Sequence, residues 1–340
     1  MYVSNVRNVC QALPATLRML IELGRHEDSR AGKVLVLPAP LMTVTQQPRE
    51  RVLRSVVRDA NPFFHMVEAI WMLAGWDDAA TLSFYVKDFG ARFAERQHGD
   101  PLPESSGFIH DAYGRRWRTA FDFDQLDAVV RRLIEDPNDR QCVITMWDPS
   151  LRGQDDLLSV WRTRPCNTHL YLRVQEHCLD MTVCCRSNDM IWGGHGANAV
   201  HFSVLQEYLA ARIDIGVGKL YQLSNNAHVY GTELDRLEKR MGKGALDYDP
   251  YTSGEVEPEP MFTEPSEIDK DIKSAMHWHN GDRSLPLFSN DWFGTTFVPA
   301  VLAFRMYRSG DIAMAIKIAG TIRSSDWRFA CVEWLQRRMK

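Results

Sequence analysis

Apolar residues recur at helical spacing in the stretch that follows Asn61, and this is the first clear element of the chain. Asn61 and Pro62 are typical of a helix cap and a first helical turn, and Gly75 is typical of a helix end. The apolar positions between them are Phe63, Phe64, Val67, Ile70, Trp71 and Ala74. The pattern predicts a buried helix, and its one disturbance is Glu68, which lies beside the apolar face.

The middle of the chain changes to strand patterning. Residues 142–147 form a short apolar run, and residues 168–174 and 178–185 alternate with period two on either side of three polar residues. We therefore expect a β-hairpin over 168–185. One face of this hairpin should carry Leu179, Met181, Val183 and Cys185.

Downstream of the hairpin the pattern becomes mostly helical. Residues 198–214 predict a helix that Asn198 caps, and residues 220–224 predict one more strand. Four prolines among acidic residues over 247–267 indicate an exposed connection. Helical periodicity then returns over 266–276, about 293–307, 310–323 and 327–338.

Together these elements predict an α+β fold, in which a mixed β-sheet packs against helices and a helical extension follows at the C-terminus. A length of 340 residues suits one large domain or two closely joined ones. We expect the main domain to span 1–245, with a linker and helical extension over 246–340 that packs on it.

The composition excludes several classes of protein. The chain is 45% hydrophobic and 25% charged, and its 40 basic and 44 acidic side chains give a formal charge of −4, which argues against disorder and against a basic nucleic-acid scaffold. We expect no secretory signal and no membrane span, because no apolar run approaches roughly 18 residues. Seven cysteines without CxxC or Cys/His spacing indicate neither a disulfide framework nor a metal site. This usage favours a reducing cytoplasm, where a free thiol can serve as a nucleophile.

The best candidate for such a nucleophile is Cys166, which stands in the segment Arg164-Pro165-Cys166-Asn167 at the entrance of the predicted hairpin. A nearby guanidinium lowers the pKa of a thiol and favours the reactive thiolate. The alternative is a buried structural cysteine, because most lone cysteines are small hydrophobic core residues.

Polar and glycine-rich segments follow the hairpin. The segment Arg186-Ser187-Asn188-Asp189 offers an arginine fork and a hydroxyl that suit a phosphate, although a solvated turn has the same composition. Residues 191–198 form a glycine-rich passage into a helix, which lets a ligand approach the backbone, but they lack the GxGxxG and P-loop patterns. His228 and Tyr230 lie on one face of an extended segment, where each would be structural by default.

In combination these segments resemble the thymidylate synthase family, which also includes the phage dUMP and dCMP hydroxymethylases. The shared motifs are Arg-Pro-Cys at 164–166, the strand pair, Arg-Ser-x-Asp at 186–189, the glycine turn before Asn198, His-x-Tyr at 228–230, Tyr-Gly-x-x-Trp-Arg at 113–118 and Asp-Pro-x-x-Arg at 136–140. Glu68 lies in the family's helix, and Arg30 stands where the family has a phosphate-loop arginine. The resemblance implies a thymidylate synthase-like sheet in the main domain, and it ends near residue 245.

The resemblance also implies roles for these residues. Cys166 would add to C6 of a pyrimidine nucleotide, so that C5 can attack the one-carbon unit of 5,10-methylenetetrahydrofolate. Glu68, Asn167 and Tyr113 would assist at the reacting atoms. The nucleotide-binding residues would be Arg30, Arg140, Arg186, Ser187, Asn198, His228 and Tyr230, and the folate-facing residues would be Asp189, Gly194 and Phe89. As in the family, the protein would be a homodimer in which Arg140 reaches the partner's phosphate site.

Departures from the family pattern gather on the folate side. Asn167 stands where thymidylate synthases have histidine, Cys185 stands where they have glutamine, and the tryptophan expected to pack on the folate is absent, with Phe89 the nearest aromatic residue. A looser folate side admits a water that hydrates the methylene group, whereas hydride transfer demands dry packing. The resemblance therefore favours dUMP hydroxymethylation of the phage type, in the cytoplasm of a bacterium or of a phage-infected host.

Other functions stay open at this point. The first alternative is a thymidylate synthase, which methylates dUMP. The second is a dCMP hydroxymethylase: the amide of Asn198 suits uracil, but the turn before it is one residue longer than usual, which makes its position uncertain. A non-enzymatic nucleotide-binding protein would not need Cys166 and Glu68, and a cysteine hydrolase using Cys166 with His228 would need an oxyanion hole that the sequence does not reveal.

Overall fold

The computed structural model describes residues 1–29, 32–94, 107–150, 156–158, 163–241, 246–282 and 284–339, so Arg30 lies outside the described residues. Its strands are β1 (Tyr2–Val6), β2 (Arg25–Ser29), β3 (Gly32–Val36), β4 (Leu41–Thr45), β5 (Val143–Thr145), β6 (Asn167–Gln175), β7 (Cys178–Cys185), β8 (Asn188–Asp189), β9 (Gly216–Ser224) and β10 (Ala227–Tyr230). Its α-helices are α1 (Val9–Leu23), α2 (Pro62–Leu73), α3 (Ala79–Ser83), α4 (Phe89–Phe93), α5 (Tyr113–Arg118), α6 (Gln125–Glu135), α7 (Asn198–Arg212), α8 (Gly231–Met241), α9 (Ile268–His279), α10 (Val298–Arg308), α11 (Ile312–Ala319) and α12 (Ser325–Gln336).

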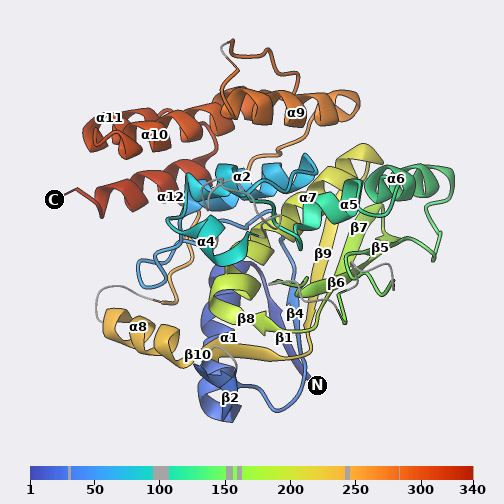
Figure 1. The fold of residues 1–340 in the computed structure, drawn as a ribbon, viewed down its shortest axis with the longest axis vertical. Helices are drawn as coiled ribbons and strands as arrows, with labels where there is room; N and C mark the ends of the chain where they lie inside the picture. Colours follow the sequence, from blue (N-terminus) through green and yellow to red (C-terminus); the bar gives the residue numbers. More distant parts are fainter. Residues whose placement is uncertain are drawn as a thin grey trace.

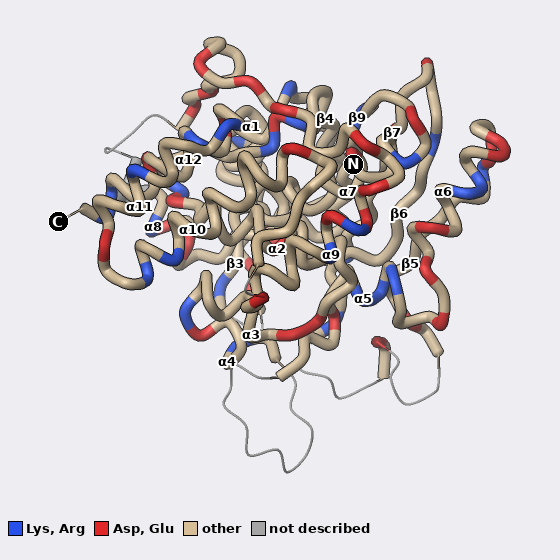
Figure 2. Tube along the Cα trace, turned by 90° about the horizontal axis from the view of Figure 1, so that it is seen from above, with Lys and Arg blue, Asp and Glu red and all other residues tan. Residues whose placement is uncertain are grey.

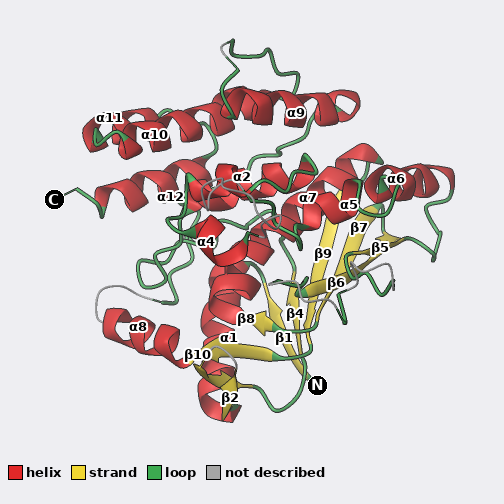
Figure 3. Ribbon diagram, in the orientation of Figure 1, coloured by secondary structure: helices red, strands yellow, loops and turns green. Residues whose placement is uncertain are grey.

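The strands form two mixed sheets, as the α+β prediction requires (Figures 1 and 3). The larger sheet has six strands in the order β1-β4-β9-β7-β6-β5, and the smaller has four in the order β2-β3-β10-β8. The predicted hairpin is confirmed as the antiparallel pair β6 and β7. The face of β7 that was expected to be apolar is buried, and it consists of Leu179, Met181, Val183 and Cys185.

Helices cover one face of the six-stranded sheet in two layers (Figure 1). Helix α7 packs directly on β7 and β9, α2 packs on α7, and α9, α10 and α12 pack on α2 from the far side. The predicted helix after Asn61 is confirmed, with the Asn61 side chain accepting a hydrogen bond from the Phe64 N–H at 3.2 Å. Because α2 lies between two helical layers, all of its residues are buried, Glu68 included.

The segment 247–267 differs from its expected exposure. Tyr251, Val256, Met261 and Phe262 are buried, and the Tyr251 hydroxyl accepts a hydrogen bond from the backbone of residue 52 and donates one to Asp326 on α12. Pro250 is buried too, whereas Pro260 and Pro265 are exposed. The buried side chains anchor the segment between the main domain and the last helix. The helices expected beyond it are confirmed as α9 to α12.

Basic and acidic residues are interspersed along the described chain (Figure 2). None of the helices in the described ranges combines the length and the apolar character needed to cross a bilayer. A large shared core contains side chains from the sheet, α2, α7 and the C-terminal helices.

Candidate active site

Helix α7 joins the candidate residues, because three side chains on its first turn reach three different elements. The Asn198 amide donates to the Asn188 side-chain oxygen on β8 at 3.4 Å. The His201 ring pairs with Glu68 on α2 at 2.8 Å, and the Phe202 ring lies 5.9 Å from the Tyr113 ring on α5. The first turn of α7 therefore brings together elements that are far apart in the sequence.

Cys166 lies at the start of β6, beside the end of β7. One Arg186 nitrogen, Nη2, lies 3.9 Å from the Cys166 sulfur, and the same guanidinium donates to the carbonyls of Pro165 at 2.9 Å and Arg164 at 3.1 Å. The Arg186 N–H also donates to the Cys166 carbonyl at 2.8 Å. Arg186 thus holds the thiol loop through its backbone and its side chain.

The pKa of the Cys166 thiol is raised above its ordinary value. Burial raises the pKa of the thiol, the Arg186 guanidinium lowers it, and Asp111 raises it further; the net direction is upward. The expectation that a neighbouring arginine favours the thiolate is correct in sign, but burial outweighs it. The thiol form of Cys166 is therefore favoured over the thiolate at neutral pH.

Tyr113 and Asn167 form a pair directly next to the thiol. The Tyr113 hydroxyl accepts hydrogen bonds from the Asn167 backbone N–H at 3.2 Å and from the Asn167 side-chain amide at 2.9 Å. Burial raises the pKa of Tyr113 well above its usual value, so the hydroxyl keeps its proton and can donate it to a third partner. Asn167 Oδ1 is buried and accepts no hydrogen bond from any described residue.

Glu68 and His201 form a buried polar pair between α2 and α7. Glu68 Oε2 lies 2.8 Å from His201 Nε2, and the two residues are 7% and 3% exposed. Sequence reasoning missed His201. Its signal was a polar residue inside an apolar helix, one turn after Asn198.

The glycine-rich turn before α7 is a π-helical segment over Met190–Ala197 with a kink at Gly196, whose φ of −105° and ψ of −108° are not helical. A π-helical turn takes up one more residue than an α-helical turn, so the longer loop leaves Asn198 at the start of α7. The expectation that Asn198 caps this helix is wrong: Ala197 occupies the cap position, and the Asn198 side chain makes no capping hydrogen bond. Because Ala197 already has helical backbone angles and the Asn198 side chain does not cap the helix, that amide can point toward Asn188.

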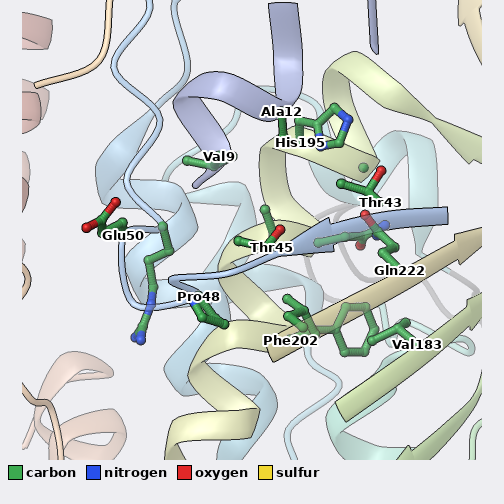
Figure 4. Close-up of a pocket in the computed structure, with 15 residues that line it drawn as sticks. Val9, Ala12, Thr43, Thr45, Pro48, Glu50, Val183, His195, Phe202 and Gln222 are labelled. Carbon is green, nitrogen blue, oxygen red and sulfur yellow. The ribbon is translucent and has the colours of Figure 1, made fainter. Parts of the chain in front are cut away.

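A small cavity lies behind this turn, with side chains from α1, β4, β9 and α7 around it (Figure 4). Its volume is ≈ 20 Å³, about the space of one water molecule. His195 borders the cavity and meets the Thr16 hydroxyl at 2.8 Å, and burial lowers the pKa of His195 to about 4. His195 is therefore neutral near pH 7, and the charged residues that line the same cavity are Glu50 and Arg51.

His228 and Tyr230 share a face of β10, as predicted, and their rings are 5.3 Å apart. His228 lies opposite Asp189 on the parallel strand β8. The His228 Nδ1 atom meets two acceptors, the backbone oxygen and the side-chain oxygen of Asn226, at 3.2 and 2.8 Å. Nδ1 therefore carries a hydrogen, which in the neutral ring leaves Nε2 as an acceptor for a hydroxyl.

Residues 22–253 match the family model described as thymidylate synthase. The chain belongs to the thymidylate synthase family. It is 36% identical to a deoxyuridylate hydroxymethyltransferase of Pseudomonas phage M6, across 99% of this chain and 95% of that protein. It is 32% identical to a deoxyuridylate hydroxymethyltransferase of Bacillus phage SP01, across 58% of this chain and 51% of that protein. The fold is similar to the crystal structure of thymidylate synthase from T4 phage, with a TM-score of 0.52, 20% identity, and coverage of 66% of this chain and 78% of that one.

The structure places the last two residues expected from the family pattern, Phe89 and Arg140, on α4 and between α6 and β5. Phe89 packs against Phe64 and Phe93, with ring centroids 5.7 and 4.9 Å away. Arg140 is exposed and borders a hollow together with Arg173 on β6. Arg173 is six residues from Asn167 along this strand, which is a distance of about 20 Å. Arg140 is thus remote from the Cys166 site of its own chain.

Proposed function

We propose that the protein hydroxymethylates C5 of dUMP through a covalent adduct of Cys166. Two relatives that are 36% and 32% identical are named deoxyuridylate hydroxymethyltransferases, and one of them matches nearly the whole chain. The site offers what the reaction needs: a thiol beside a guanidinium, a buried carboxylate and an amide that can read a base. Addition of Cys166 to C6 would give C5 the electron density to form a carbon–carbon bond.

The nucleotide would lie along Arg186, Asn198 and His228. The Arg186 fork and the Ser187 hydroxyl suit the phosphate, and that hydroxyl makes no hydrogen bond within the described residues. The acceptor nitrogen of His228, with Tyr230 beside it, suits the sugar hydroxyl. Arg30 would add a second guanidinium to the phosphate by the family resemblance.

The surface next to the turn before α7 fits a folate. Trp192 is 47% exposed, and the buried Arg58 guanidinium lies 3.9 Å from its ring centroid. The Asp189 carboxylate lies at the base of the same turn, whereas Gly194, which the family resemblance places on the folate side, is buried against Met190 and Asn188. A flat heteroaromatic ring with N–H groups suits the combination of indole and carboxylate. When bound there, 5,10-methylenetetrahydrofolate supplies the one-carbon unit.

One observation favours hydroxymethylation over methylation. Asn167 Oδ1 is a buried acceptor next to Cys166 that no described residue satisfies, and its amide is held by the Tyr113 hydroxyl. Such an acceptor suits a water that attacks the exocyclic methylene, and the water would gain a fixed orientation from it. Histidine at this position, as in thymidylate synthases, would not present the same amide oxygen.

The outer face of the six-stranded sheet supports a homodimer. Among the described residues, helices cover only the face of this sheet that α7 contacts (Figure 1). On the strands Tyr171 is 46% and Val143 is 41% exposed, and Tyr171 borders a hollow of ≈ 840 Å³. A second copy packed there would cover this surface and would give Arg140 a route to the partner's phosphate site. The described candidate residues all precede residue 245, which agrees with a catalytic part over 1–245 and an extension over 246–340.

The product distinguishes the proposal from its alternative. With dUMP and methylenetetrahydrofolate, the purified protein should form 5-hydroxymethyl-dUMP, seen by mass spectrometry, without a rise in dihydrofolate absorbance. A methylated nucleotide with stoichiometric dihydrofolate would overturn it and identify a thymidylate synthase. Light scattering should show a dimer, and a fully active single 39.0 kDa chain would refute the shared site.

A further inference from the structure

Asn188 has no assigned role, yet it lies at the centre of the base-reading region. It is the variable residue of the Arg-Ser-x-Asp segment and is 2% exposed. Its amide nitrogen donates to the Ser224 hydroxyl oxygen at 2.9 Å, and its amide oxygen accepts from the Asn198 amide at 3.4 Å. The three side chains thus form a continuous polar chain from β9 to α7.

The position of the Asn188 side chain is closely constrained. Its backbone N–H donates to the Asn226 carbonyl at 2.9 Å, which holds β8 against the strand end. Gly193 and Gly194 lie over the amide: a Cβ on Gly193 would be 3.0 Å from the Asn188 oxygen, and one on Gly194 would be 3.2 Å from the Asn188 nitrogen. The glycines therefore let the turn lie directly on this amide, which leaves it little room to move.

The side-chain amide of Asn198 has some hydrogen-bonding groups that are used by Asn188 and others that remain for a ligand. One of its two N–H groups is used by Asn188, and its oxygen accepts from no described residue. One N–H and one carbonyl oxygen remain for a ligand, which is the complement of O4 and N3–H of uracil. A flipped Asn198 amide, which cytosine requires, would bring its oxygen against the oxygen of Asn188.

The geometry points to Asn188 as a positioning residue that sets uracil over cytosine by fixing the orientation of the Asn198 amide. This inference rests on the proposed function, since it concerns the same nucleotide site. Asn188 does not touch the base; it acts through Asn198. A merely structural residue would change the affinity for both nucleotides alike, whereas a positioning residue changes their ratio.

The test compares two near-isosteric variants of the full chain. Asn188→Leu removes the acceptor, whereas Asn188→Asp keeps an acceptor toward Asn198 and can accept from Ser224 at its other oxygen. Dissociation constants for dUMP and dCMP would be measured by calorimetry for each protein. In Asn188→Leu the preference for dUMP should fall about tenfold or more, because a bidentate base contact loses its fixed orientation. In Asn188→Asp the preference should be kept or increased.

The outcomes separate the inference from the proposed function. An unchanged preference in Asn188→Leu, or a reduced preference in Asn188→Asp, would overturn the role of Asn188 while the dUMP site stands. A wild-type chain that binds neither nucleotide would overturn the proposed function itself. If Asn188→Leu does not fold, Asn188→Ala, which also lacks the acceptor, should show the same reduced preference, and an unchanged one would again overturn the role.

Discussion

Tyr113→Phe removes a single oxygen atom from the centre of the candidate site. That oxygen accepts two hydrogen bonds, from the backbone N–H and the side-chain amide of Asn167. The phenyl ring would keep its packing against Trp117 and Phe202, whose rings lie 6.4 and 5.9 Å away. The substitution therefore leaves two buried donors without a partner and changes little else.

The free energy of unfolding should fall by about 2–4 kcal/mol, since each buried unsatisfied donor costs about 1–3 kcal/mol and the chain relaxes partly around it. For a chain of 340 residues the unfolding entropy is about 0.7 kcal/mol per kelvin, so the midpoint of thermal unfolding should drop by about 3–6 °C. Differential scanning calorimetry measures both quantities. A midpoint equal to that of the wild type would show that the two hydrogen bonds contribute nothing to stability.

The same variant should lose turnover more than nucleotide affinity. Asn167 follows Cys166 directly, so a loosened Asn167 misplaces the sulfur, and a displacement near 1 Å costs about 100-fold in rate. Release of tritium from 5-tritiated dUMP reports the carbon chemistry, and calorimetry reports dUMP binding. Wild-type tritium release from the variant would refute the reasoning.

Tyr85→Phe is the matched control for this experiment. The Tyr85 hydroxyl is also buried, and it makes one hydrogen bond, to His279 Nε2 on α9 at 2.8 Å. Its loss should cost about 1 kcal/mol of stability and leave tritium release unchanged. Reduced tritium release in Tyr85→Phe would mean that the assay responds to general destabilisation.

Three further predictions concern the chemistry of the site. Glu68→Gln keeps the shape and a hydrogen bond to His201 but removes the carboxylate, so tritium release should fall by about 10²–10⁴-fold with dUMP affinity retained; full turnover would exclude Glu68 from the proton transfers. Alkylation of Cys166 by iodoacetamide, followed by peptide mapping, should rise only as the pH passes above 9, because burial raises the pKa of this thiol. Arg186→Leu should move the rise in Cys166 alkylation to higher pH, because the guanidinium lowers the pKa of the thiol. A wild-type alkylation rate that is already maximal at neutral pH would contradict the raised pKa. Mixing Cys166→Ser and Arg140→Ala chains should restore about a quarter of wild-type activity if sites are shared across a two-fold axis, whereas no recovery would refute the sharing.

Much of the fold could be predicted from the sequence because its signals are local. Period-two alternation predicted β6 and β7, and the Asn61-Pro62 start predicted α2. The contact of Cys166 with Arg186 also follows from local order, because the two residues end neighbouring strands of one hairpin. Glu68 lies on α2 and the Arg-Pro-Cys motif directly precedes β6, so this part of the candidate site could be predicted with these elements.

The pairings inside the site were decided by the tertiary structure alone. Glu68 with His201, and Asn188 with Asn198, join side chains from different elements, and no spacing along the chain indicates which polar residue meets which. The pKa of Cys166 was also decided by the tertiary structure, since an adjacent arginine predicts a lower pKa but burial raises it. Burial depends on how distant segments pack, and it is therefore set only when the two helical layers and the sheet close around the site.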